Sequence, residues 1–176
     1  KAWRDLIAEF PDEPGGYERL LRLAENHFDD GAAVRIAQDV AAMPSPAGIG
    51  AAARAILDRH ALVGRSLADL AHATLGAATD RGTILYTWSA TVPGSLTLGR
   101  DLARSRPAGA RLVGINFDAD AAAAQALAAA EKLPGENVYD PSGFTGPLAQ
   151  ALGLRRVGEV YVADRQGIIR SVSARR

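Results

Sequence analysis

Residues 84–95, ILYTWSATVPGS, combine an apolar run with a turn of small residues. The run has the length and composition of a buried β-strand, and Pro93-Gly94-Ser95 are residues that begin a helix. A strand that carries a turn to the start of a helix is typical of thiol active sites, because a helix N-terminus stabilises a thiolate. The chain contains no cysteine, however. Disulfides, thiolate nucleophiles and thiolate metal sites are therefore excluded for this sequence.

Ser95 is the residue of this turn that could replace a thiol as nucleophile. A serine hydroxyl is a very weak acid, and its activation needs an adjacent base that the turn does not supply. We therefore expect Ser95 to be the N-cap of a helix over residues 95–105, a contribution of about 1 kcal/mol. We expect Trp88 to pack beneath the turn and not to form a platform for a ligand, because aromatic side chains mainly contribute buried area.

Two other patterns suggest sites but have simpler structural interpretations. Asp118 and Asp120 could form a carboxylate pair for a metal ion, yet an aspartate between a strand and an alanine run more often caps a helix. Gly48 and Gly50 superficially resemble a dinucleotide-binding turn, but they follow Pro-Ser-Pro and are expected to begin a helix. The histidines are scattered and form no ligand cluster: His27, His60 and His72. We expect no metal and no cofactor.

The composition limits the classes of partner. The 20 basic residues equal the 20 acidic ones, so no net charge favours nucleic acid or an anionic membrane surface. No stretch approaches the roughly 20 apolar residues that a membrane-spanning helix needs. The chain begins at Lys1 and not at methionine, so we expect it to be a processed or excised piece of a longer protein. Nothing in the sequence indicates an oligomeric state.

Residues 1–63 are predicted to form an all-α segment. Apolar residues recur at three- and four-residue steps in residues 17–28 and 34–43, which places them on one face of each helix. The breaks are short and contain glycine, proline and aspartate, so neighbouring helices are expected to be antiparallel. We predict about four short helices arranged as helical hairpins, loosely similar to tetratricopeptide pairs.

Residues 64–176 are predicted to form a separate α/β domain, whose first part to residue 82 is mainly a connection. The expected elements are strands over 84–88 and 111–117, helices over 95–105 and 121–132, a short helix over 146–152, and a hairpin that turns at 165–167. Alternating strands and helices of this size predict βαβ units with a parallel sheet. The final hairpin extends that sheet with antiparallel strands.

The run from Gly82 to Ser173 resembles the thioredoxin superfamily, specifically its bacterial TlpA-like and redoxin branch. In that branch a strand ends in a pattern like W-x-x-x-C-P-P-C, and residues 88–95, WSATVPGS, align with this pattern without a gap. The most specific match is residues 139–172, where a short helix ends in glycine and leads through a loop into two strands joined by an Asp and a Gly. The resemblance implies a thioredoxin-like fold, with βαβ and a C-terminal β-hairpin, preceded by the helical-hairpin segment.

The sequence departs from the family pattern at the positions that carry its chemistry. Val92 and Ser95 stand where the family has its two cysteines, and Gly158 stands where it has a cis-proline. The resemblance therefore implies a degenerate active site made of Trp88, Val92, Pro93, Gly94, Ser95 and Gly158, with no catalytic residue. Arg155 and Arg156 flank the loop that faces this turn. They could hold an anionic ligand, although exposed charges of this kind are more often simply solvated.

Three functional hypotheses remain open. In the first, the chain is a redox-inactive thioredoxin-like module that binds or scaffolds a protein or peptide. In the second, it is a thiol-disulfide oxidoreductase or peroxiredoxin-like enzyme by descent, whose activity depends on cysteines outside this chain. In the third, it is one structural domain of a larger envelope protein. Resemblance to the TlpA-like branch implies the periplasm or cell envelope of a bacterium.

Overall fold

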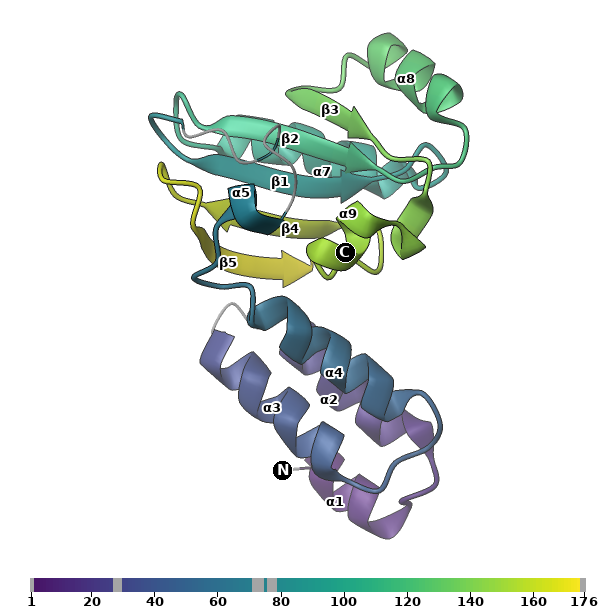
Figure 1. Ribbon diagram of the computed structural model, residues 1–176. Helices are drawn as coiled ribbons and strands as arrows, with labels where there is room; N and C mark the ends of the chain where they lie inside the picture. Colours follow the sequence, from purple (N-terminus) through teal and green to yellow (C-terminus); the bar gives the residue numbers. More distant parts are fainter. Residues whose placement is uncertain (1, 27–29, 71–74, 76–78, 175–176) are drawn as a thin grey trace. The chain divides into compact units, whose positions relative to one another are not determined.

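The computed structural model describes residues 2–26, 30–70, 75 and 79–174 (Figure 1). The chain forms two compact units, Lys1–Ala61 and Leu62–Arg176. Of the three histidines, His27 and His72 lie outside the described residues, and His60 is buried at the end of a helix. Among the described residues, no helix combines the length and the apolar character that crossing a membrane requires.

The first unit is all-α, as predicted. Its helices are α1 (Ala2–Glu9), α2 (Pro14–Asn26), α3 (Asp30–Ala42) and α4 (Ile49–His60). Helix α3 packs against α2 and α4, and α1 packs against α2. The core contains Tyr17, Ala37 and Val40 from the faces that the apolar spacing predicts, together with Ile56 of α4. Gly48 is the N-cap of α4, with a φ of 89° that favours glycine, so its predicted role as a helix start is confirmed.

Tyr17 links the core of the helical unit to two of the connections between its helices. The residue is 1% exposed, and its single hydroxyl proton is shared between the backbone oxygens of Pro11 at 3.0 Å and Pro44 at 2.7 Å. Both acceptors lie in the proline-containing breaks between helices. One buried tyrosine therefore satisfies carbonyl groups from two connections that are far apart in the sequence.

The second unit is built on a mixed five-stranded sheet in the order β3-β2-β1-β4-β5. Its strands are β1 (Thr83–Trp88), β2 (Arg111–Asn116), β3 (Glu136–Tyr139), β4 (Glu159–Ala163) and β5 (Ile169–Ala174), and its helices are α5 (Leu67–Leu70), α7 (Pro93–Ser105), α8 (Ala121–Ala130) and α9 (Pro147–Ala151). Strands β1, β2 and β3 are parallel, β4 is antiparallel to β1, and β5 is antiparallel to β4. The predicted parallel βαβ unit with an antiparallel hairpin is confirmed.

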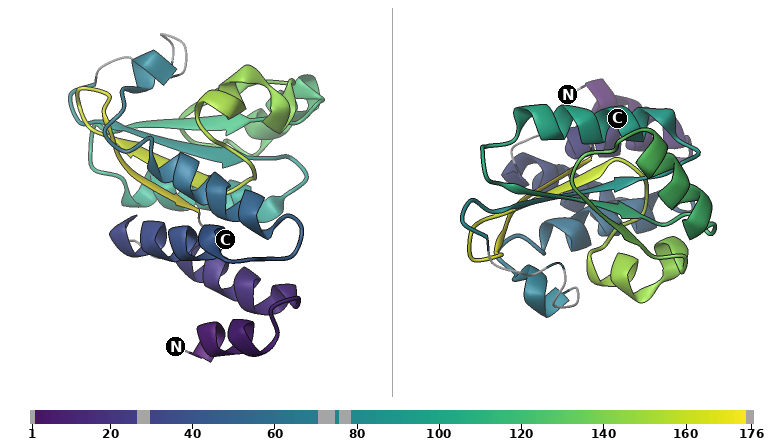
Figure 2. Two further views of the ribbon diagram at one scale, coloured as in Figure 1. Left: turned by 60° about the horizontal axis from the view of Figure 1, so that its bottom comes forward. Right: turned by 90° about the horizontal axis from the view of Figure 1, so that it is seen from above.

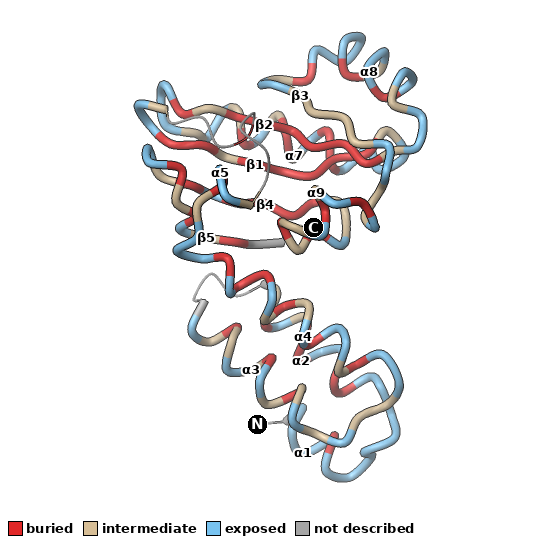
Figure 3. The backbone as a smooth tube through the Cα atoms, in the orientation of Figure 1, coloured by how far each residue is buried: buried red, intermediate tan, exposed pale blue. Residues whose placement is uncertain are grey.

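Helices cover both faces of the sheet. Figure 2 shows α7 on one side and α5 and α9 on the other. Buried side chains form one core on each face, with Trp88 and Leu96 on the α7 side and Leu85 and Leu152 on the α9 side. Figure 3 shows that burial concentrates on the central strands. The strands therefore lie between two apolar layers, and their ends hold the surrounding loops in place.

Strand β3 was not predicted. It has four residues at the edge of the sheet, Glu136 is exposed, and the other three are only half-buried. A short edge strand of this kind lacks the apolar alternation that identifies a strand in sequence. Hydrogen bonding to β2 makes this segment a strand. The two strands are parallel, with Val113 opposite Glu136 and Asn116 opposite Tyr139.

Helix α7 packs closely on β1 at Gly99, which faces Tyr86. A Cβ atom at this position would lie 2.5 Å from the hydroxyl of Tyr86. Burial, together with nearby Tyr139, raises the pKa of Tyr86 well above its ordinary value, so the phenol stays neutral. The glycine thus allows the middle of α7 to pack directly against Tyr86 of β1.

Candidate functional site

The turn after β1 leads directly into α7. The helix begins at Pro93, with Val92 as its N-cap, so the prediction that Ser95 is the N-cap is wrong. Proline at the first helical position has the φ that a helix requires and needs no hydrogen-bond acceptor, and it therefore starts the helix two residues earlier. Ser95 is buried in the first turn, whereas Val92 is 42% exposed.

Ser95 ties the first turn of α7 to the end of β1. Its hydroxyl donates to the backbone oxygen of Val92 at 2.6 Å and accepts from the backbone N–H of Ser89 at 3.1 Å. Both partners belong to the backbone, and the side chain is 3% exposed. The hydroxyl is therefore used for structure, which agrees with the expectation that it is not a nucleophile.

Asp118 holds the same turn from the loop that follows the neighbouring strand β2. Its carboxylate accepts from the Ser89 hydroxyl at 2.6 Å, the Ala90 N–H at 2.7 Å and the Asn116 amide at 2.9 Å. The prediction that Asp118 caps the following helix is wrong. Asp120 alone does so, accepting from the N–H of Ala123 at 2.9 Å. We call Ser89, Ala90, Asn116 and Asp118 the aspartate clasp.

The aspartate clasp depends on an ionised carboxylate. Partial burial raises the pKa of Asp118, but hydrogen bonds from Ser89, Asn116 and Ala90 act in the opposite direction and leave it below the 3.8 of an unperturbed aspartate. An ionised carboxylate has only acceptor sites, and all three of these partners donate. The turn after β1 is thus fixed by charge-assisted hydrogen bonds at neutral pH.

Thr87 holds the second loop of the site, which precedes β4. Its backbone oxygen accepts from the N–H of Gly158 at 3.1 Å, and its hydroxyl donates to the Arg156 oxygen and accepts from the Glu159 N–H, each at 2.9 Å. Gly158 has a φ of 92°, a conformation that other residues adopt only with strain. Loop and turn are therefore both anchored to the end of β1.

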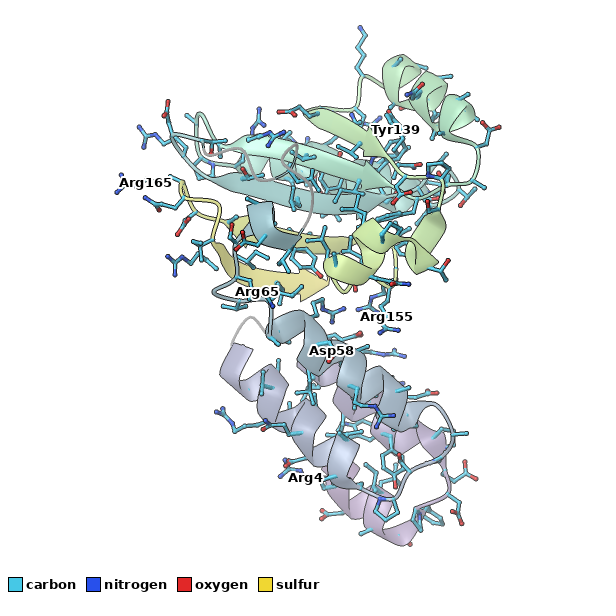
Figure 4. All side chains as sticks on the ribbon, viewed as in Figure 1. Arg4, Asp58, Arg65, Tyr139, Arg155 and Arg165 are labelled. Carbon is cyan, nitrogen blue, oxygen red and sulfur yellow. The ribbon has the colours of Figure 1, made fainter. Side chains whose placement is uncertain are left out.

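Glu159, the first residue of β4, also anchors this loop. The residue is 0% exposed, and its carboxylate accepts from the backbone N–H of Arg155 at 2.9 Å. The Arg155 side chain is exposed on the loop (Figure 4). This hydrogen bond ties the first part of the loop to the start of β4.

Between turn and loop lies a groove of about 630 Å³. It is lined by Val92, Gly94, Ser95, Thr97, Leu98 and Asp101 from the turn and α7, and by Arg156, Val157 and Gly158 from the loop. The structure thus brings together four of the positions predicted to form a degenerate site, Val92, Gly94, Ser95 and Gly158, together with Arg156. Pro93, Trp88 and Arg155 do not line the groove. We call this space the turn–loop groove.

Trp88 lies beneath the turn and not in the groove. Its side chain is 0% exposed and packs with Leu96 of α7 and Ala124 of α8. The rings of Trp88 and Tyr139 meet edge to face, with centroids 6.0 Å apart. The tryptophan therefore supports the turn from the core and offers no face to a ligand.

Sequence reasoning missed two residues that position the site, Thr87 and Glu159, and gave a third, Asp118, the wrong role. Each lies at the end of a strand next to the turn or the loop. Polar residues at strand ends of a parallel sheet were available as a signal, because ligand sites of α/β sheets lie at that edge. Asp118 was considered only as a possible metal ligand or as a helix cap, and neither interpretation predicted its bonds to Ser89 and Ala90.

The strand order, with one antiparallel strand between otherwise parallel ones and helices on both faces, defines a thioredoxin-like fold. No family model matches the chain, and no curated protein matches it. Solved structures that resemble it include a thioredoxin-like protein from Parabacteroides distasonis, with 17% identity over 53% of this chain and 73% of that chain, and a TM-score of 0.45.

Two further solved structures are similar over comparable shares of the chain. A thiol-disulfide oxidoreductase from Bacteroides fragilis has 17% identity over 55% of this chain and 74% of that one, with a TM-score of 0.47. StoA from Bacillus subtilis has 18% identity over 53% of this chain and 73% of that one, with a TM-score of 0.44. The strand order and register, and not these overall similarities, identify the fold.

The chemistry open to the turn–loop groove is limited by its lining. The chain has no cysteine, and the hydroxyl of Ser95 is bonded to backbone. The remaining ionisable groups of the lining are Asp101, which pairs with Arg104 at 2.5 Å, and Arg156. The lining can therefore contact a ligand through apolar surface, hydrogen bonds and charge.

Proposed function

We propose that the α/β unit is a redox-inactive thioredoxin-like domain that binds a protein or peptide segment in the turn–loop groove. The observation that carries this proposal is a groove lined by Val92 and Ser95, the two positions at which the thioredoxin pattern has its cysteines. The groove volume of about 630 Å³ lies in the range typical of ligand sites. The aspartate clasp and Thr87 fix its two walls, which supports a preformed site.

The lining favours an extended segment with one apolar side chain. Val92, Leu98 and Val157 supply apolar surface, while Gly94 and Gly158 leave the backbone open to close approach. We propose that Arg156 binds an acidic group beside that side chain. Arg155 is assigned no contact in the groove, because its side chain does not line it.

We further propose that residues 1–63 and 64–176 are separate domains, with the helical one as a second contact surface. A location in the periplasm or cell envelope of a bacterium is proposed from the resemblance to the TlpA-like branch. An oxidoreductase activity would need a cysteine from outside this chain, and no feature of the groove favours it.

Selection of peptides tests the binding proposal. Random peptides displayed on phage are selected on the full chain, and an enriched peptide is synthesised and titrated. Thr97→Trp fills the groove and is expected to weaken binding by about tenfold or more. Ala122→Trp, at an exposed position of α8, is the matched control and should leave the affinity unchanged. Absence of enrichment, or equal weakening by both variants, would contradict the proposal.

Insulin reduction tests the proposed loss of redox chemistry. The purified chain with dithiothreitol is expected to reduce insulin no faster than dithiothreitol alone, because neither thiol position can form a thiolate. The same expectation holds for hydrogen peroxide consumption. Turnover above the reductant background in either assay would overturn the proposed inactivity, whatever the result of peptide selection.

A further inference from the structure

Helix α1 carries apolar side chains on a face that the helical unit does not cover. Ile7 is buried against α2, but Trp3, Leu6 and Phe10 are 39%, 37% and 48% exposed. Phe10 continues the last turn of α1, since its N–H donates to the Leu6 oxygen at 2.8 Å. The spacing of three and four residues places the exposed trio on one side of the helix. We call this trio the α1 face.

A small groove adjoins the α1 face. Its volume is about 250 Å³, and it is lined by Leu6, Ile7, Phe10, Glu13, Gly15 and Gly16. Gly16 lets the start of α2 approach α1 closely, because a Cβ there would lie 2.8 Å from Ile7. The groove has room for one large apolar side chain and lies at the Phe10 end of the face.

The two ends of the α1 face carry opposite charges. At one end the guanidinium of Arg19 lies 5.9 Å from the ring centroid of Trp3. At the other end Glu13 lines the groove, next to the exposed carboxylates of Glu9 and Asp12. Within the described part of the chain, neither Arg19 nor Glu13 forms a salt bridge. Arg4, by contrast, is paired with Asp39 of α3 (Figure 4).

We propose that the α1 face is a self-association surface on which a second copy of this chain docks antiparallel. A two-fold axis perpendicular to α1 brings the Arg19 end of each copy to the Glu13 end of the other. The same operation directs Trp3 of each copy towards the groove of the other. A parallel arrangement would oppose arginine to arginine and carboxylate to carboxylate. The charges therefore select the antiparallel pairing.

This proposal is independent of the turn–loop groove, because every residue that it uses lies in the helical unit. The surface comprises one short helix and the start of the next, which is smaller than a standard permanent interface. The expected association is therefore weak and reversible, with a Kd of about 10 µM to 1 mM.

Sedimentation velocity of the full chain from about 5 µM to about 500 µM tests the association. We expect a concentration-dependent shift from monomer to dimer, accompanied by a blue shift of tryptophan emission as Trp3 becomes buried. Phe10→Ser should raise the Kd at least tenfold. Leu23→Ser, which removes another exposed apolar side chain from α2, is the matched control and should not change it. A monomer at every concentration would overturn the proposal.

A charge exchange tests the antiparallel pairing itself. Arg19→Glu and Glu13→Arg are each expected to weaken association about tenfold, because each puts like charges opposite one another. The double variant should recover most of the affinity, since it exchanges the two charges and keeps them complementary. Circular dichroism of each variant checks that the helices are retained. A dimer that is insensitive to Phe10→Ser, or a double variant as weak as the singles, would overturn it.

Discussion

Replacement of Asp118 by alanine is expected to lower the free energy of unfolding of the α/β unit by about 3 kcal/mol. The substitution removes the acceptor for Ser89, Ala90 and Asn116, and two of these donors are buried. The Ser89 hydroxyl keeps its contact with Thr91 and the Asn116 amide keeps its bond to the Trp88 oxygen, but both lose the stronger charge-assisted bond to the carboxylate. Urea unfolding followed by Trp88 fluorescence in a Trp3→Phe background measures the change.

Asp120→Ala is the matched control, because Asp120 is an aspartate two residues away with one hydrogen bond in an exposed helix cap. Its expected cost is about 1 kcal/mol. Equal effects of Asp118→Ala and Asp120→Ala would show that the clasp has no special role in the turn.

The effect of Asp118→Ala should depend on pH. The pKa of Asp118 is lowered in the folded state from the 3.8 of an unperturbed aspartate. A lowered folded pKa means that the stabilisation is fully present above the unfolded pKa and is lost as pH falls through the folded pKa. The difference between wild type and variant should therefore be full at about pH 6 and decrease on titration below about pH 3.8.

The double variant Val92→Cys/Ser95→Cys is expected to gain thiol-disulfide activity. The two positions occupy the first turn of α7, where the Ser95 N–H donates to the Val92 oxygen at 2.9 Å. Val92 is exposed and Ser95 is buried, so a thiol at the first position can meet a substrate and one at the second can resolve the mixed disulfide. Insulin reduction should rise clearly above the background, and the oxidised variant should contain one disulfide by mass.

The single variant Val92→Cys is the control for this gain, because it provides the attacking thiol without a partner in the chain. It should form mixed disulfides but turn over little insulin. A double variant that forms no intramolecular disulfide would show that the turn does not have the geometry of a thiol site.

Much of the α/β unit was predictable because its signals are local. Proline and glycine mark the turns, and the final hairpin turns where expected, with Asp164 accepting from the N–H groups of Gln166 and Ile168. The start of α7 was misplaced by two residues, because Pro93 was taken as part of the turn. Strand β3 was missed because its pairing with β2, and not its own pattern, makes it a strand.

The contacts of the candidate site were not predictable in the same way. Asp118 bonds to Ser89 and Ala90, which lie 29 and 28 residues earlier in the chain. That contact follows from the parallel register that places Trp88 opposite Asn116. A sequence shows an aspartate after a strand, but the residue it meets depends on which strand lies beside it. Local capping rules therefore gave the right answer for Asp120 and the wrong one for Asp118.

The central claim is that the turn before α7 provides the environment of a reactive thiol although it contains no cysteine. The most direct test is the thiol pKa of the Val92→Cys variant, measured by the pH dependence of alkylation. The helix N-terminus should lower this pKa to about 7 or less, while Arg104→Cys at the other end of α7 should stay near 8.5 or above. Equal pKa values near 8.5 for the two variants would contradict the claim.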